Sequence, residues 1–272
     1  MKNKRFLIAA TGISPYFTEP AYTELIFRLA KAIHAQGGQV RMFMPKFGVI
    51  NERKMQLHEV IRLSGTNIVV DDEDIPLIIK VASIPKERMQ VYFIGSSENF
   101  HQKMFLFDEK GDIRSDLTDF MIFFAKGVVE TAKKLNWNAD YIINAGWFTS
   151  FLPLYLKTYY AHEPLLHHSQ LIHLLINDIR LKGTLPGDVA KKFRFDEIDE
   201  KDYSVYLPAG EKHLMSGASH FADILMSGEE KLQSGLQEIF NQNHHFKGKI
   251  TLPLLEENSR IFGEILEQYQ TL

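Results

Sequence analysis

Apolar residues in the first part of the chain recur with the spacings of a strand, a helix and a second strand. Phe6–Ala10 is a continuous apolar run, which is typical of a strand buried on both faces. Pro20–Gln36 carries its apolar residues on one helical face, and Gly37-Gly38 then ends the helix. Gln39–Met44 is a second apolar run. This order predicts a βαβ unit with parallel strands.

The next part of the chain, residues 46–95, has a different pattern. Short β-like runs are separated by polar turns, and the runs are Val60–Leu63, Asn67–Val70, Ile75–Val81 and Met89–Ile94. We expect an insertion that contains antiparallel strands. The acidic segment Asp71–Asp74 lacks the spaced ligands and the glycine of a calcium loop, so we interpret it as a solvated turn.

Strands and helices alternate again in the remainder of the chain. The expected elements are Leu117–Leu135, Phe151–Tyr160, Gly210–Ala222, Glu229–Phe240 and Leu254–Tyr269 as helices, and Tyr141–Asn144, Leu171–Ile176 and Ile224–Ser227 as strands. The pattern predicts an α/β protein with an open, mostly parallel Rossmann-like sheet, flanking helices and a small antiparallel insertion. We expect residues 1–250 to form one α/β domain and residues 251–272 to add a C-terminal helix that packs on it.

Ligands of such sheets bind beyond the carboxyl ends of the strands. The segments Thr11–Glu19, Ala145–Thr149 and Leu174–Asn177 follow three of the expected strands. We therefore expect any binding site to be built from these three loops, although the fold alone does not identify a ligand.

Composition narrows the class of protein. The chain has 272 residues, of which 45% are hydrophobic and 24% charged, with a net charge of -3 and a pI near 6.4. The acidic balance and the lack of a basic run argue against nucleic-acid binding. The absence of cysteine excludes disulfides and cysteine-ligated metals. Because no apolar run approaches the roughly 18 residues of a membrane span, we expect a cytoplasmic protein.

General motifs do not indicate a reaction. The sequence contains no dinucleotide-binding glycine motif, no P-loop and no nucleophile elbow, and we expect no cofactor. His162, His167, His168 and His173 match no metal-binding spacing, so we predict no metal site. The acidic stretch from Asp196 to Asp202 has the character of a solvated surface segment.

The first loop and helix carry a resemblance to a known family. Thr11–Leu25 resembles the opening of bacterial glycogen and starch synthases, whose pattern there is S-E-x-x-P-x-x-K-T-G-G-L-A-D-V. Met44–Gly48 is similar to the family's L-P-R-Y-G, and Trp147–Lys157 to its H-D-W-H-T-x-x-x-P-x-Y-L-K. Leu171–His173 resembles the T-I-H-N strand, and Gly217–Ser227 the K-G-G-x-x-Y-A-D segment with the T-V-S-P that follows.

The resemblance covers roughly residues 4–240 and implies one half of a two-domain glycosyltransferase. Members of this family transfer glucose from ADP-glucose to the end of an α-1,4-glucan in a cleft between two α/β domains. The N-terminal domain mainly supplies the acceptor side, and the second domain holds most of the sugar nucleotide. The resemblance therefore implies a glucan or a sugar nucleotide as ligand, and a partner chain that would supply the second domain.

Several family residues that carry the chemistry are replaced. The lysine of K-T-G-G falls on Thr18 and its glycines on Pro20 and Ala21, while Glu19 adds a negative charge. The H-D-W-H motif becomes Ala145–Phe148, and the arginine of Y-D-R falls on Gln102, after Phe100 and His101. In T-I-H-N, His173 is kept and the asparagine becomes Leu174.

Three interpretations follow from these replacements. The first is a non-catalytic relative whose cleft binds a ligand or a protein partner, and the cleft residues implied are Gly12, Tyr16, Thr18, Glu19, Phe100, Trp147, Phe148 and His173. The second is a glucosyltransferase half that another chain completes. The third is a different enzyme that uses His173 and Glu24 as acid and base. Alternatively, the aromatic residues of the first set simply pack in the core, and the accessibility of Trp147 distinguishes the two possibilities.

Overall fold

A single nine-stranded sheet organises the molecule. The computed structural model describes residues 1–17, 21–96, 100, 106–107 and 110–271. Across the sheet the strands are β11 (Phe246–Lys249), β10 (Ile224–Ser227), β9 (Gln170–Leu175), β8 (Tyr141–Ala145), β1 (Arg5–Ala10), β2 (Gln39–Pro45), β7 (Gln90–Gly95), β6 (Ile78–Ser83) and β3 (His58–Glu59). Every pairing from β11 to β7 is parallel. The last two pairings, β7 with β6 and β6 with β3, are antiparallel. The predicted open, mostly parallel α/β sheet is confirmed.

Strand β1 lies at the centre of the sheet because the chain adds strands on both of its sides. It pairs with β2 on one side and with β8 on the other, with Ala9 in register with Phe43 and with Asn144. The residues Phe6–Ala10 are fully buried, which explains their unbroken apolar pattern. The chain changes direction across the sheet between β1 and β8, and this change creates the topological switch point.

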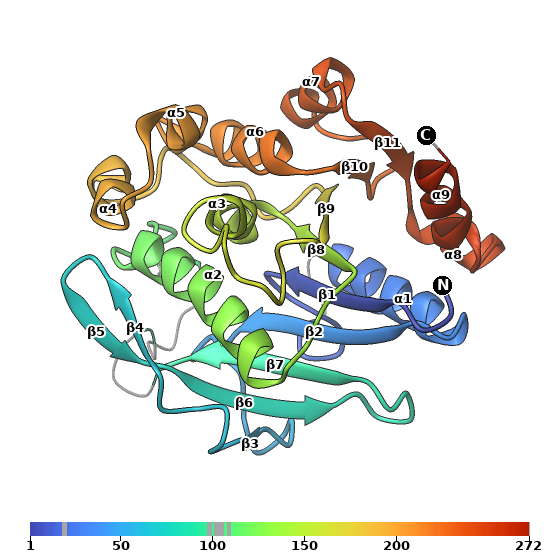
Figure 1. The fold of residues 1–272 in the computed structure, drawn as a ribbon, viewed down its shortest axis with the longest axis horizontal. Coiled ribbons are helices and arrows are strands. Elements are labelled where there is room, and N and C mark those ends of the chain that lie inside the picture. The colour runs from blue at the N-terminus through green and yellow to red at the C-terminus, as the bar shows by residue number, and fades with distance from the viewer. Residues whose placement is uncertain (18–20, 97–99, 101–105, 108–109, 272) are drawn as a thin grey trace.

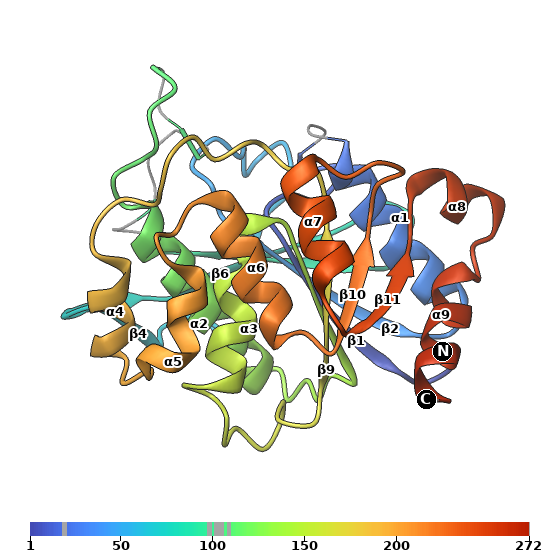
Figure 2. The same cartoon turned by 90° about the horizontal axis from the view of Figure 1, so that it is seen from above.

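Helices cover both faces of the sheet. On one face, α2 (Leu117–Lys134), α3 (Phe151–Lys157) and α6 (Glu211–Phe221) lie in a row, with α7 (Ser234–Gln242) beside α6 (Figures 1 and 2). On the other face lies α1 (Tyr22–Ala35), which buries an apolar stripe that includes Leu25, Ile26 and Leu29 against the sheet. Each helix thus buries its apolar face in one continuous core.

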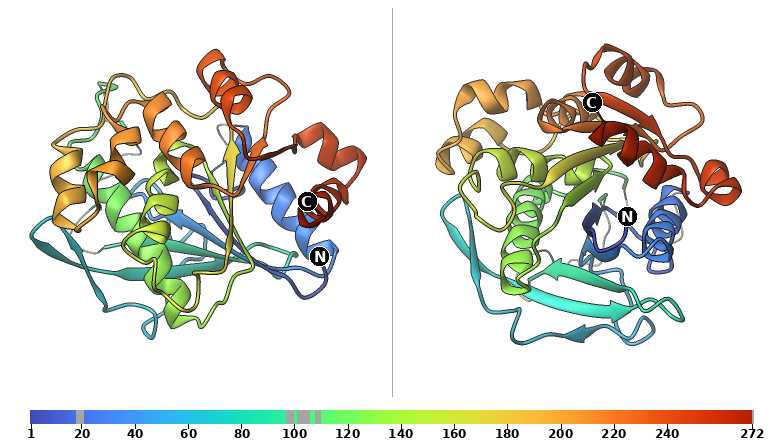
Figure 3. Two further views of the ribbon diagram at one scale, coloured as in Figure 1. Left: turned by 45° about the horizontal axis from the view of Figure 1, so that its top comes forward. Right: turned by 45° about the vertical axis from the view of Figure 1, so that its right-hand side comes forward.

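Two short C-terminal helices lie against α1. They are α8 (Leu252–Glu257) and α9 (Ile261–Gln270), and both contact α1 (Figure 3). The prediction of a single helix over Leu254–Tyr269 is wrong, because the helix is interrupted at Asn258. Its side-chain oxygen accepts the N–H of Arg260 at 2.9 Å, a local bond that competes with helix continuation.

The insertion differs from the sequence prediction in two places. Val60–Leu63 forms a turn in which the N–H of Leu63 donates to the oxygen of Val60 at 2.8 Å, and the strand precedes it at His58–Glu59. Ile75–Val81 is divided at Leu77 between β5 (Glu73–Pro76) and β6. β5 pairs with β4 (Asn67–Val70) in a hairpin that projects from one end of the molecule (Figure 1).

Two helices that precede α6 were not expected from the apolar pattern. They are α4 (Val189–Phe195), whose N-terminus is capped by Asp188, and the single-turn α5 (Glu200–Tyr203). The segment from Glu229 is not yet helical, and α7 begins only at Ser234. Among the described helices, none has both the length and the apolar character needed to cross a bilayer.

Candidate functional site

Three loops meet at the carboxyl ends of the central strands. Thr11 follows β1, Gly146 follows β8, and Asp178 lies three residues beyond the end of β9. This edge is the switch point of the sheet, where open α/β folds bind their ligands. The loops that the sequence indicated therefore come together, and Asp178 lies one residue beyond the third of them.

Gly146 permits a very close approach of Asp178. Its φ is 81°, a conformation that favours glycine, and a β-carbon built on it would lie 2.4 Å from Asp178 Oδ2. The same β-carbon would lie 3.3 Å from Thr11 Oγ1. The Asp178 carboxylate thus occupies the space beside β8 that any side chain at this position would need.

The carboxyl group of Asp178 is buried at this junction. Thr11 donates its hydroxyl to Oδ2 at 3.4 Å, and the backbone N–H of Ile179 donates to Oδ1 at 2.7 Å. The Tyr22 hydroxyl is buried close by, but it forms no well-aligned hydrogen bond with a described residue. Burial raises the pKa of Asp178 to about 7, against the opposing effect of these donors. Asp178 therefore exchanges its proton near neutral pH.

Two further carboxyl groups hold the loop that follows β9. The N–H of Asn177 donates to Glu229 at 3.2 Å, and the N–H of Leu181 donates to Glu211 at 3.0 Å. Burial raises the pKa of both Glu211 and Glu229. Together with Asp178, these residues make this edge of the sheet rich in carboxyl groups, and burial favours the neutral form of each.

His173 and Glu24 lie on opposite faces of the sheet. His173 is fully buried in β9, where its Nδ1 lies 3.1 Å from the hydroxyl of Ser219 on α6. Burial lowers the pKa of His173 to about 3, so the imidazole is neutral. Glu24 lies on α1 and forms a surface ion pair with Arg28 at 2.7 Å. The structure does not bring these two groups together as an acid and a base.

The expected aromatic residues are core residues. Trp147 and Phe148 are 0% exposed, Phe100 is 5% exposed and Tyr16 is 7% exposed. The Trp147 indole donates to the carbonyl of Ile179 at 2.7 Å. The expectation that they line an accessible cleft is therefore wrong, because large rings supply the packing between the sheet and its helices.

The remaining predicted cleft residues lie in the first loop. A β-carbon on Gly12 would lie 3.2 Å from Cβ of Phe17 and 3.3 Å from Cγ2 of Thr23, so the loop packs closely on the start of α1. Thr18 and Glu19 lie outside the described residues. Among the described residues, no group of His, Asp and Glu side chains converges to hold a metal ion.

The acidic stretch contains one carboxylate that is buried. Asp196 is buried, and its Oδ1 accepts from Nζ of Lys126 at 2.6 Å. The Tyr155 hydroxyl donates to Oδ2 at 2.5 Å. The interpretation of Asp196 as a solvated residue is wrong, because a lysine of α2, distant in sequence, compensates its charge. Nothing in the sequence near Asp196 indicates this partner.

The fold defines the class of the protein as an α/β domain built on an open, mostly parallel sheet. The catalytic domain of starch synthase IV from Arabidopsis thaliana, bound to ADP and acarbose, superposes with a TM-score of 0.72 at 15% identity. That match covers 92% of this chain and 52% of the plant domain. At this identity the likeness shows the fold alone.

Sequence comparison then identifies the family. The model described as starch synthase catalytic domain matches residues 6–247, and the chain belongs to this family. The glycogen synthase of Chlorobium limicola is 32% identical over 228 residues, which cover 82% of this chain and 45% of the relative. That of Chlorobium phaeobacteroides is 30% identical, over 84% of this chain and 49% of the relative. The chain thus spans about half the length of these relatives.

Proposed function

We propose that this chain is a glycogen synthase-like domain that does not transfer glucose by itself and instead binds a ligand or a protein partner. The observation that supports the proposal most strongly is the exchange at Gly146. The family motif has an aspartate at this position, and here the buried Asp178 takes the space from the loop of another strand. The carboxyl group at this position therefore comes from a different strand's loop than the family motif implies.

The charge of the same edge supports the proposal. Glucosyl transfer from ADP-glucose needs fixed donors and positive charge around the departing diphosphate. The buried polar groups described at this edge are instead carboxyl groups: Asp178 after β9, Glu229 after β10 and Glu211 at the start of α6. Burial raises their pKa values, and in neither protonation state do they supply positive charge to a diphosphate. The retained family histidine, His173, is inaccessible beneath α6.

A second candidate function is a glucosyltransferase half that another chain completes. The observation in its favour is that the match to the glycogen synthases extends over most of this chain but only about half of each relative. In that case, a second chain would supply the domain that holds most of the ADP-glucose, and the cleft would form between the two chains.

Ligand-dependent thermal stability distinguishes the two candidates. The chain is titrated separately with ADP-glucose, ADP, glucose and maltooligosaccharides. A ligand at about 100 times its dissociation constant stabilises a one-site protein by about 2.7 kcal/mol, which raises Tm measurably. We expect no shift with ADP or ADP-glucose. A shift with either would favour the enzyme half, and a shift with oligosaccharide alone would identify the ligand of the non-catalytic domain.

A further inference from the structure

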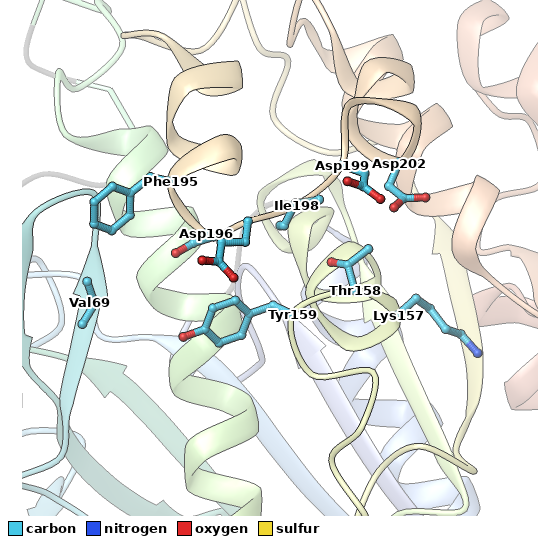
Figure 4. Close-up of a pocket in the computed structure, with 10 residues that line it drawn as sticks. Val69, Lys157, Thr158, Tyr159, Phe195, Asp196, Ile198, Asp199 and Asp202 are labelled. Carbon is cyan, nitrogen blue, oxygen red and sulfur yellow. The ribbon is translucent and has the colours of Figure 1, made fainter.

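A hollow lies at the opposite end of α3 from the switch point. It encloses about 600 Å³ between the β4 strand, the end of α3 and the turn that joins α4 to α5 (Figure 4). Helix α3 begins just after β8 at the switch point and ends at Lys157, where the hollow begins. The hollow is therefore separate from the candidate site described above.

One wall of the hollow is apolar. Tyr159 is 48% exposed, Phe195 is 46% exposed and Val69 is 39% exposed, and all three line the hollow (Figure 4). The described residues expose only five large hydrophobic side chains, so three of the five gather here. Exposed apolar side chains that cluster in a concave site indicate a binding surface rather than ordinary surface scatter.

Part of the rim of the hollow is acidic. Glu197 and Asp202 line the hollow, and neither has an ion-pair partner among the described residues. The neighbouring Asp199 meets only the exposed Lys201, at 3.1 Å. Lys157, the basic residue of the lining, points away from the rim and lies 3.8 Å from Asp223 (Figure 4). The rim therefore presents negative charge to any approaching group.

At the floor of the hollow, the charge of Asp196 is compensated by a buried ion pair. Both carboxylate oxygens of Asp196 are occupied, by Lys126 and Tyr155. The Lys126 ammonium also lies 4.7 Å from the centre of the Tyr159 ring, which holds that ring in place at the mouth. A preformed aromatic wall lowers the entropic cost of binding.

We propose that this hollow binds a short basic segment of a partner protein, in which apolar residues alternate with Lys or Arg. The apolar side chains of the segment would cover Val69, Phe195 and Tyr159, and its cations would meet Glu197 and Asp202. The charge complementarity selects a basic partner, and the apolar wall selects a peptide over a bare cation, which would leave the wall exposed to water. This inference does not depend on the function proposed for the switch point.

Fluorescence anisotropy with synthetic peptides tests the proposal. The probe is a labelled short peptide that alternates Lys or Arg with Leu or Phe. Two reference peptides replace its basic residues by Glu, or its apolar residues by Ser. We expect binding of the probe that weakens as salt is raised, no binding of the acidic peptide, and binding of the polar basic peptide at least about tenfold weaker.

Variants locate the binding on the protein. The double variant Glu197→Gln and Asp202→Asn removes both rim charges. It should weaken binding of the probe about fivefold, because each exposed ion pair contributes little to affinity. Phe195→Ala should weaken it about tenfold, because aromatic anchors dominate interfaces. The matched control changes the exposed pair Glu256→Gln and Glu257→Gln on α8, and it should leave affinity unchanged.

Four outcomes would overturn the proposal. They are no binding of the probe at roughly 1 mM, equal binding of the polar basic peptide, equal loss in the α8 control, and concentration-dependent self-association that Phe195→Ala abolishes. Equal binding of the polar peptide would indicate a simple cation site, and the last result would assign the hollow to a second copy of this chain.

Discussion

The carboxylate of Asp178 fills the space in which a side chain on Gly146 would have to lie. A β-carbon on Gly146 would be 2.4 Å from Asp178 Oδ2, well inside van der Waals contact. The two residues follow neighbouring strands, β8 and β9, so the contact joins the loops at the switch point. Any side chain at position 146 would therefore require the Asp178 carboxylate to move from its present place.

The first prediction concerns Gly146→Ala. The change should destabilise the fold by about 2–4 kcal/mol, because alanine is strained at a φ of 81° and its methyl group collides with Asp178. Urea unfolding measures the loss. Gly183→Ala is the matched control, since its φ is 82° but nothing lies within 4 Å of the added carbon. It should show only the strain, about 1 kcal/mol.

A double variant separates the collision from the strain. Adding Asp178→Gly to Gly146→Ala removes the carboxylate that the methyl group meets. The combined loss should therefore be smaller than the sum of the two single losses, by about 1–3 kcal/mol. Strict additivity would show that Gly146 and Asp178 do not compete for the same space.

The second prediction concerns pH. The pKa of Asp178 is about 7 in the folded protein and near 3.9 when unfolded, so the folded state binds more protons between these values. The contribution of Asp178 to the free energy of unfolding is fully present below about pH 4 and is lost as the pH rises to about 7. Asp178→Asn cannot titrate. Its free energy of unfolding should therefore rise relative to the wild type across this range, and constancy of the difference would contradict the raised pKa.

The third prediction concerns the buried pair of Lys126 and Asp196. Lys126→Met should cost about 3–5 kcal/mol, because it leaves a buried carboxylate without its counter-charge. Lys212→Met breaks an exposed pair with Glu238 and should cost less than about 1 kcal/mol. Chemical denaturation compares both with the wild type. Similar costs would mean that the Lys126 pair is solvated rather than buried.

The fourth prediction concerns the docking of the C-terminal helices. Phe262 on α9 is fully buried, and its ring lies 6.0 Å from that of Phe6 on β1. Phe262→Ala should destabilise the domain by about 3–5 kcal/mol through the cavity it leaves. The exposed Glu267→Ala on the same helix is the control and should change stability by no more than about 0.5 kcal/mol. A stable Phe262→Ala variant would show that α9 contributes little.

Local patterns were sufficient for the elements that depend on local residues. The unbroken apolar run Phe6–Ala10 indicated a strand buried on both faces, and the stripe on α1 indicated its buried face. Strand topology also indicated where the loops would meet. Val60–Leu63 and Leu254–Tyr269 were misjudged because turn and side-chain hydrogen bonds at Val60 and Asn258 end the regular structure.

Long-range partners determined what the sequence could not show. The position of Asp178 after an apolar strand was a visible signal, but its contact with Gly146 requires the register of β8 and β9. In the sequence, Asp196 is one carboxylate among several, and its partner Lys126 lies far away on α2. Phe148 lies where the family motif has a histidine, and its ring packs against Phe120 and Phe124 of α2, which the sequence around it does not indicate.

Glucosyl transfer by the chain alone tests the central claim most directly. Radiolabelled ADP-glucose and glycogen are incubated with the purified protein, and label in the glycogen is counted. A glycogen synthase such as that of Chlorobium limicola serves as the positive control. The proposed non-catalytic function predicts no incorporation above the blank. Sustained, enzyme-dependent incorporation by this chain alone would contradict the account.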